Sequence, residues 1–251
     1  MKIDVLLSPL NADELHFTGK TTVVIDVLRA TTTIVTALQN GAREVVPVGS
    51  VDFAMKISGS AAGGQTLLCG ERNITMIEGF SLGNSPLEYD EETIKGKTIV
   101  FFTTNGSKSI VKAKFSENLL IASFINMNAI VNHLVELGND VEILCSGSEG
   151  KFCIEDTACA GKIISEIKSR VHEVILTDSG RASELIYDSF GKNLDEMLLN
   201  CDHGKKLQEK GFADDIKYCS QLSISDIVPY YDAGTIKIVQ PKEVQQSENK
   251  N

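Results

Sequence analysis

The chain lacks any long hydrophobic run. Its N-terminal stretch, MKIDVLLSPLNADELHF, contains only a few consecutive apolar residues, and Asp4 interrupts them. A membrane-spanning helix needs about 20 apolar residues, and the apolar part of a secretory signal needs about 7 to 15. We therefore expect no membrane partner, no export signal and a cytoplasmic location.

Positive charge is also scarce. Lys and Arg number 24 against 34 Asp and Glu, which gives a formal net charge of −10. Nonspecific nucleic-acid binding needs a basic surface that neutralises phosphates, so the charge argues against a nucleic-acid partner. A small anionic ligand is compatible with this charge, because a few Arg side chains and backbone N–H groups next to the ligand outweigh the repulsion from distant acidic residues.

Clustered metal-binding residues of the zinc type are missing as well. The six cysteines have no CxxC spacing, and the four histidines lie far apart along the chain. Because zinc sites in proteins need closely spaced Cys and His, this pattern argues against zinc. Scattered cysteines in a chain of this length predict free thiols in a reducing cytosol.

What the chain does contain is a regular alternation of short apolar runs and helical patterns. Strands are expected at 3–7, 22–26, 45–48, 66–69, 98–102, 119–123, 141–145 and 174–178, and helices at 32–39, 51–58, 127–137 and 157–167. Continuous apolar strands alternating with helices predict an α/β fold, here a three-layer α/β/α arrangement with a largely parallel or mixed sheet. Residues 227–231 and 235–239, joined by DAG, predict a closing hairpin.

Two segments of the chain resemble each other. TVVIDVLRATTTIVTA (22–37) and TIVFFTTNGSKSIVKA (98–113) both read as a strand, a polar turn and a helix. An internal duplication and the chance recurrence of a common motif both explain this likeness. We expect residues 1–240 to form one unit. A duplication would divide this unit into two βαβα subdomains, residues 1–95 and 96–240. Residues 241–251 are polar and predict a disordered tail.

Polar turns follow the expected strands. Ligands of parallel α/β sheets bind at the carboxyl ends of strands, where loops meet helix N-termini. Arg29, Thr31 and Thr32 follow the strand at 22–26, and the TTNGS turn, with Thr104, Asn105 and Gly106, follows the strand at 98–102. Backbone N–H groups at such turns, with an Arg nearby, favour an anion. Ordinary helix capping explains either turn taken alone.

Acidic residues occur at the same strand ends. Asp26, Glu71 and the pair Glu155–Asp156 each follow an apolar strand. Hard oxygen ligands beside anion-binding turns suit phosphoryl chemistry assisted by Mg²⁺, which shields phosphate charge and activates water. For Glu155 and Asp156, which open a helix, complementation of the helix dipole is the alternative.

Familiar phosphate-handling motifs are absent or incomplete. CSGSEGK (145–151) has the spacing of a cysteine-phosphatase loop but ends in Lys151, where Arg is required. DVLR (26–29) lacks the second Asp of a haloacid-dehalogenase motif, and neither GxxxxGK nor GxGxxG occurs as a nucleotide loop. Cys145 is disfavoured as a nucleophile, because nothing nearby in the sequence lowers its pKa.

Five segments together resemble one known family. DVLRATTTIVTALQNGAREVVPV (26–48), GERN (70–73), GFSLGNSP (79–86), TTNGS (103–107) and EDTACAG (155–161) resemble the ComB family, the 2-phosphosulfolactate phosphatases, collinearly over residues 1 to 240. The resemblance implies Mg²⁺-dependent hydrolysis of 2-phosphosulfolactate to 3-sulfolactate and phosphate, a step toward coenzyme M. One departure is Ile74, which follows the Asn of GERN where members often have Gly.

The resemblance also implies roles for the segment 70–89, which we expect to be a functional loop. In it Glu71 would face the metal, Arg72 the anionic substrate, and Asn84 and Ser85 would be neutral donors. The full expected site has Asp26, Arg29, Glu71 and Asp156 as catalytic residues; Arg29, Thr31, Thr32, Arg72, Asn84, Ser85, Thr104, Asn105 and Gly106 as substrate-binding residues; and Asp26, Glu71, Glu155 and Asp156 as metal ligands.

The expected partner is a small phosphorylated and sulfonated anion, with a homodimer left open. Two alternatives remain. One is a phosphatase of another phosphorylated hydroxy acid, and the other is a noncatalytic binding protein for an anionic metabolite.

Overall fold

The computed structural model describes residues 1–60 and 65–240 and has one mixed sheet of 11 strands in this part of the chain. In spatial order the strands are β5 (Thr75–Met76), β4 (Thr66–Arg72), β6 (Thr98–Phe102), β3 (Glu44–Pro47), β11 (Thr235–Ile238), β10 (Pro229–Asp232), β7 (Asn118–Ala122), β2 (Thr21–Ile25), β8 (Val141–Cys145), β1 (Lys2–Leu6) and β9 (Ile175–Leu176). The α/β prediction with a largely parallel or mixed sheet is confirmed.

The sheet consists of two parallel blocks joined by the C-terminal hairpin. Strands β4, β6 and β3 are parallel to one another, as are β7, β2, β8, β1 and β9. The hairpin of β10 and β11 is antiparallel, and it pairs with β7 on one side and β3 on the other. The predicted closing hairpin is therefore correct. The expected polar tail at 241–251 lies outside the described residues.

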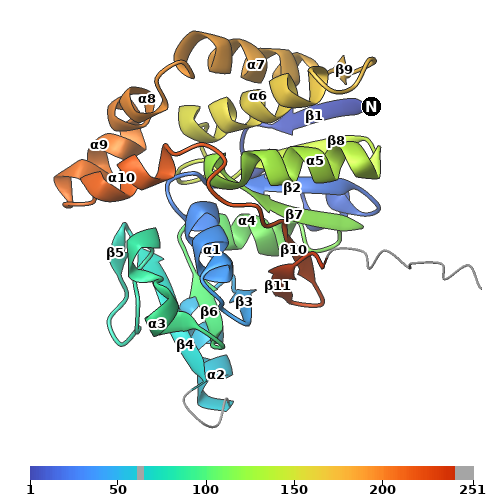
Figure 1. Cartoon of the computed structure of the whole chain (residues 1–251). Coiled ribbons are helices and arrows are strands. Elements are labelled where there is room, and N and C mark those ends of the chain that lie inside the picture. The colour runs from blue at the N-terminus through green and yellow to red at the C-terminus, as the bar shows by residue number, and fades with distance from the viewer. Residues whose placement is uncertain (61–64, 241–251) are drawn as a thin grey trace, which may run out of the picture.

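Helices cover both faces of the sheet (Figure 1). Their bounds are α1 (Ala30–Gln39), α2 (Val51–Ser60), α3 (Glu91–Ile94), α4 (Gly106–Lys112), α5 (Met127–Leu137), α6 (Ile154–Lys168), α7 (Asp178–Phe190), α8 (Leu194–Asn200), α9 (Asp202–Glu209) and α10 (Ala213–Cys219). Short 3₁₀ helices are η1 (Pro9–Asn11), η2 (Glu14–Phe17), η3 (Pro86–Glu88) and η4 (Phe124–Asn126). Within the described residues, no helix combines the length and the apolar character needed to cross a membrane.

Two cores lie on opposite faces of the larger block. Helices α5 and α6 bury Ile130 and Ile163 against Ile25 and Ile143 on one face. Helices α1 and α4 bury Ile34 and Ile110 against residues of the other face, including Val24. Strands β2, β6 and β8 are buried along their whole lengths, as expected for strands covered on both sides.

The carboxyl ends of β2 and β6 meet. A Cβ atom added at Gly106, the first residue of α4, would lie 2.5 Å from Asp26 Oδ2 and 2.5 Å from Ala30 Cβ. Only glycine permits this approach, since real Cβ atoms do not tolerate contacts this short. The two strand–turn–helix segments that resemble each other in sequence therefore contact each other through their turns.

The segment 70–89 is not a loop throughout, and this part of the prediction is wrong. Strand β4 continues to Arg72, and the chain turns back at once into β5, so that Glu71 pairs with Met76. Gly70 makes this possible, because it has φ +132° and any Cβ there would lie 1.8 Å from the Phe102 carbonyl oxygen. Glycine thus marks a close backbone approach within the strand rather than the end of the strand.

Strands from both sides of residue 95 lie in each block of the sheet. Strand β6 lies between β3 and β4, while β1 and β2 pair with β8. A division of the chain between residues 95 and 96 therefore does not coincide with the division of the sheet into two blocks, because each block contains strands from both parts of the chain. The duplication itself stays a prediction.

Candidate active site

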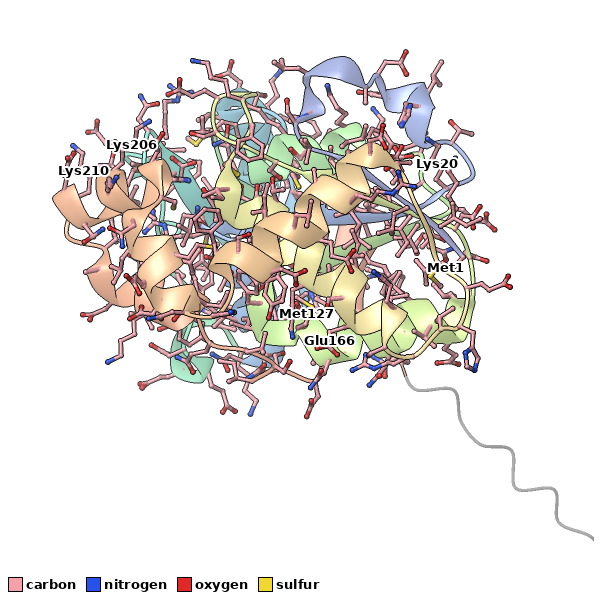
Figure 2. The ribbon with its side chains drawn as sticks, turned by 90° about the horizontal axis from the view of Figure 1, so that it is seen from above. Met1, Lys20, Met127, Glu166, Lys206 and Lys210 are labelled. Atoms are coloured by element: carbon pink, nitrogen blue, oxygen red, sulfur yellow. The ribbon has the colours of Figure 1, made fainter. Side chains whose placement is uncertain are left out.

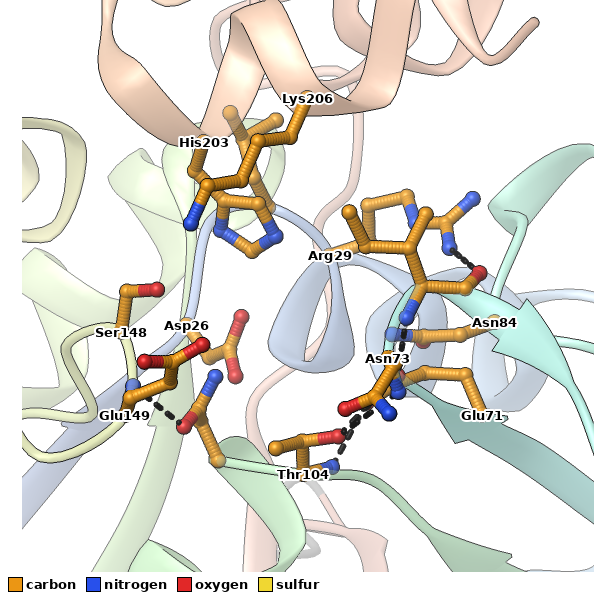
Figure 3. Close-up of a pocket in the computed structure, with 13 residues that line it drawn as sticks. Asp26, Arg29, Glu71, Asn73, Asn84, Thr104, Ser148, Glu149, His203 and Lys206 are labelled. Atoms are coloured by element: carbon orange, nitrogen blue, oxygen red, sulfur yellow. Dashed lines mark hydrogen bonds between the residues drawn. The ribbon is translucent and has the colours of Figure 1, made fainter. Parts of the chain in front are cut away.

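A cavity of about 210 Å³ lies where the ends of β2, β4 and β6 meet helix α9. Figure 3 shows its lining side chains, which come from segments far apart in the sequence. They are Asp26, Leu28, Arg29, Glu71, Asn73, Ile74, Asn84, Thr104, Asn105, Ser148, Glu149, His203 and Lys206. Six of the residues predicted from the sequence are therefore brought together here: Asp26, Arg29, Glu71, Asn84, Thr104 and Asn105.

Asp26 is the buried acid of this cavity. Its side chain follows β2, and its Oδ1 accepts a hydrogen bond from the backbone N–H of Ala30 at 3.2 Å. The pKa of Asp26 is raised to about 6, mainly by burial; Glu71 and Glu155 also raise it, while His203 and the hydrogen bond from Ala30 lower it. A carboxyl group with this pKa changes its charge near neutral pH, which is a property typical of functional sites.

Glu71 organises the TTNGS turn. Its Oε1 accepts a hydrogen bond from the Thr104 N–H at 2.6 Å, and its Oε2 accepts one from the Ile74 N–H at 2.7 Å. The Thr104 hydroxyl also donates to Oε2 at 3.2 Å. We expected both turns to bind an external anion. Instead, carboxylates of the protein accept hydrogen bonds from them: Asp26 at the start of α1, and Glu71 at the turn before α4.

Arg29 is fully committed to protein contacts in the pocket wall. Its Nη1 donates to Asp215 Oδ2 at 2.6 Å, and its Nη2 donates to the Ile74 carbonyl at 3.0 Å. The guanidinium also lies 4.1 Å from the centre of the Phe212 ring, and the side chain is 2% exposed. Arg29 therefore ties α1 to α10, and Asp215 compensates its charge.

Asp156 lies behind the cavity rather than in its lining. Its Oδ1 accepts from the Val27 N–H at 2.9 Å and its Oδ2 from the Gly147 N–H at 3.0 Å. Burial raises its pKa well above the ordinary value, and Asp26 and Glu155 raise it further. Asp156 does not cap α6 through a hydrogen bond, because both donors belong to the segments after β2 and β8. It does lie in the first turn of α6, as complementation of the helix dipole requires.

Glu155 lines a second cavity, of about 510 Å³, which adjoins the first. The two share Ser148, Glu149, His203 and Lys206 in their linings. Glu155 is buried, and its Oε1 lies 3.5 Å from His203 Nδ1. The carboxylate therefore faces the imidazole at the junction of the two cavities.

Five predicted substrate-binding residues do not line the first cavity. Thr31 and Thr32 are buried, and their hydroxyls donate to the carbonyls of Asp26 and Val27. The Ser85 hydroxyl donates to Asp215 Oδ1 at 2.7 Å. Gly106 packs against Asp26, as described above, and Arg72 is exposed and absent from the lining. The threonines fix the turn after β2, and Ser85 helps to hold Asp215.

Several lining residues were missed by sequence reasoning. His203 and Lys206 both come from α9, and Asn73, Ser148 and Glu149 come from loops. The available signal was CDHGKK (201–206), a His followed by two Lys at a helix start. Histidines were weighed only as members of a zinc cluster, and a single His that faces carboxylates of other segments gives no such pattern.

The donor set suits magnesium more than a densely liganded metal. Within residues 1–60 and 65–240, no three His, Cys, Asp or Glu side chains are grouped so that they could hold a metal ion. Mg²⁺ usually takes only one or two protein carboxylates, and water and substrate phosphate complete its octahedron. Asp26 fits that mode of binding. It lines the pocket, and the neighbouring acids Glu71 and Glu155 disfavour its negative charge. Glu71 fits it less well, since backbone donors already occupy both its oxygens.

Taken together, the fold and the cavity define an α/β protein in which the ends of β2, β4 and β6 surround a small cavity lined by a buried carboxylate. The sequence profile described as 2-phosphosulpholactate phosphatase matches residues 8–234. The chain belongs to this family, and it is accordingly a phosphoric monoester hydrolase.

Individual relatives agree over nearly the whole chain. A protein of Clostridium novyi is 44% identical over 92% of this chain and 97% of its own length. Proteins of Clostridium acetobutylicum and Thermotoga maritima are 39% and 40% identical, over 94% and 90% of this chain and 100% and 94% of their own lengths. All three carry the name probable 2-phosphosulfolactate phosphatase.

Proposed function

We propose that this enzyme hydrolyses 2-phosphosulfolactate to 3-sulfolactate and phosphate with the help of Mg²⁺. The names of relatives at about 40% identity support the substrate. The observation that carries the chemistry is Asp26, a buried carboxylate with a pKa of about 6 in the lining of a small cavity. On the basis of the family resemblance, the same proposal places this reaction in coenzyme M biosynthesis.

The cavity suits a substrate that bears several negative charges. His203 and Lys206 contribute cationic or proton-donating side chains, and Asn73, Asn84 and Thr104 contribute neutral polar groups. The Asn84 Oδ1 atom is buried and has no hydrogen-bond partner in the structure. A buried acceptor of this kind is costly unless a donor, such as a water molecule that accompanies the ligand, satisfies it.

Asp26 would hold the metal ion, and Glu155 and Asp156 would add negative charge nearby. A bound Mg²⁺ would neutralise phosphate charge and promote attack by water. Glu71 is assigned a different role from the one expected, namely to fix the turn of Thr104 and Asn105 through its three hydrogen bonds.

His203 would handle the proton of the leaving group. Hydrolysis breaks the ester P–O bond, water supplies the hydroxyl that joins phosphorus, and the departing alcohol oxygen takes up a proton. His203 lines the cavity, and Glu155 Oε1, 3.5 Å from Nδ1, would orient the imidazole. Nε2 is then available to donate to the departing oxygen, which is general acid catalysis.

The experiment is phosphate release from a panel of phosphomonoesters with Mg²⁺ and with EDTA. The panel contains 2-phosphosulfolactate, 2-phospholactate, phosphoglycerates and an aryl phosphate. We expect the highest kcat/KM for 2-phosphosulfolactate, and loss of activity on chelation. Preference for another phosphorylated hydroxy acid would assign that compound as the substrate instead.

A further inference from the structure

Lys206 is a cation at the junction of the two cavities. It lies on α9 and belongs to the linings of both the 210 Å³ and the 510 Å³ cavity. Figure 3 shows it beside His203, with its ammonium group directed into the pocket. Figure 2 shows Lys206 and Lys210 at the end of the molecule opposite to Lys20. Lys206 is therefore placed to meet a group that extends from the first cavity toward the second.

The other strong cation of the pocket is already paired. Arg29 donates to Asp215 Oδ2 and to the Ile74 carbonyl, and its guanidinium lies against the Phe212 ring. By contrast, the ion pairs within 4.0 Å found among the described residues do not include Lys206. Among the Lys and Arg side chains that line the first cavity, the positive charge free to meet a ligand is thus that of Lys206. Lys151, which is also outside these ion pairs, lines only the second cavity.

Two acids of the first cavity, Glu71 and Asp26, accept hydrogen bonds from the backbone. Glu149 lines both cavities; its backbone N–H donates to Asn105 Oδ1 at 3.0 Å, while its carboxylate is a further acid of the lining. Glu155 and Asp202 line the second cavity. An acid group of the substrate that binds beside Lys206 would avoid Asp26 and contact Lys206 from the side of the second cavity.

We propose that Lys206 binds the sulfonate group of the substrate and thereby determines specificity, an inference that rests on the proposed function. A sulfonate is a permanently charged group with three equivalent oxygens. An ammonium group, with three donors on a flexible stem, matches it without the planar geometry that a guanidinium requires. The phosphate would then lie beside Asp26 and His203, and the sulfonate toward the second cavity.

The test crosses one substitution with two substrates. Lys206→Gln removes the charge but keeps most of the stem, and Lys210→Gln, on a residue outside both linings, is the matched control. The substrates are 2-phosphosulfolactate and 2-phospholactate, which carries hydrogen in place of the sulfonate. Hydrogen bonds to charged groups contribute about 1.5–3 kcal/mol, which corresponds to about 10- to 100-fold.

We expect Lys206→Gln to lower kcat/KM for 2-phosphosulfolactate about 10- to 100-fold, mainly through KM, because a remote anion is bound in both ground and transition states. For 2-phospholactate the loss should stay below about 3-fold, and Lys206→Arg should recover part of the loss. Lys210→Gln should match the wild type on both substrates.

Two results would overturn the assignment while leaving the phosphatase function intact: equal losses on both substrates, or no loss on either. Equal losses would assign Lys206 to the phosphate or to folding. A wild-type enzyme that releases no phosphate from 2-phosphosulfolactate would overturn the proposed function, and the assignment with it. Thermal melting of all four proteins, the wild type and the three variants, identifies a folding defect independently of activity.

Discussion

Arg29 and Asp215 form a buried ion pair in which Arg29 Nη1 lies 2.6 Å from Asp215 Oδ2, and the two side chains are 2% and 4% exposed. The pair joins Arg29, the residue just before α1, to Asp215 of α10, which lies 186 positions later in the chain. Asp215 also accepts a hydrogen bond from Ser85. One carboxylate thus connects three segments that surround the active site.

Asp215→Asn should destabilise the protein strongly. Removing one partner of a buried ion pair leaves an uncompensated charge and costs about 3–5 kcal/mol. Urea unfolding would measure the change, and Asp214→Asn, at the exposed neighbouring position, is the control. Equal unfolding free energies for the wild type and Asp215→Asn would show that the pair contributes nothing.

Asp26 should make the metal-free protein less stable as the pH rises. Its pKa is about 6 in the folded state against an ordinary 3.8, so the folded state binds more protons between these values. Stability is therefore lost as the pH rises through this window, by a total of about 3 kcal/mol.

Asp26→Asn removes this titration, and Asn can still accept the hydrogen bond from Ala30. In EDTA we expect the variant and the wild type to be similarly stable near pH 4 and the variant to be more stable at pH 7. Denaturant unfolding across this range provides the measurement. A constant difference at all pH values would mean that Asp26 titrates normally.

Magnesium should stabilise the wild-type protein through Asp26. A ligand that binds only the folded state raises stability by RT ln(1 + [L]/Kd), about 2.7 kcal/mol at a concentration of 100 Kd. Adding Mg²⁺ to metal-free protein should therefore raise the Tm of the wild type but not that of Asp26→Asn. Identical increases in both proteins would move the metal to another site.

Gly106→Ala should disturb the position of Asp26. The added Cβ would lie 2.5 Å from both Asp26 Oδ2 and Ala30 Cβ, so that the two turns must separate. Inserting a methyl group into a packed site typically costs about 1–3 kcal/mol, and displacing a catalytic group by 1 Å can cost about 100-fold in rate.

The matching control is Gly49→Ala, because a Cβ there meets nothing within 4 Å and the backbone φ is not positive. Thermal melting and kcat/KM together measure the effect. Full activity in Gly106→Ala would show that the contact between the turns is not needed for catalysis.

Much of the fold follows from local sequence. The strands 22–26, 98–102 and 141–145 were correctly predicted because their apolar runs are continuous, which is the pattern of strands buried on both faces. The order of the strands did not follow from the sequence. The hairpin at 229–238 lies between two parallel blocks, and no local pattern carries that information.

The active site was predictable where residues follow a central strand. Asp26, Glu71 and Thr104 were found because ligand sites lie at the carboxyl ends of parallel strands. Arg72 was misplaced because it was treated as part of a loop, whereas successive strand residues point to opposite faces. With Glu71 directed into the cavity, Arg72 must point away.

The contribution of α9 and α10 could not be derived locally. His203, Lys206 and Asp215 occur in short helices with ordinary polar patterns. The partners of His203 and Asp215 are Glu155 and Arg29, in other parts of the chain. Only the tertiary structure brings these charges together.

The hairpin of β10 and β11 also has a consequence for the order in which the chain can finish folding. The strands of both blocks are complete at Leu176, long before Pro229 is reached by the ribosome. Until the hairpin is added, β3 and β7 each present an unpaired edge, and such edges are prone to join those of other chains. A nascent or truncated chain that ends before Pro229 is therefore expected to aggregate, although it already contains Asp26, Glu71, His203 and Asp215.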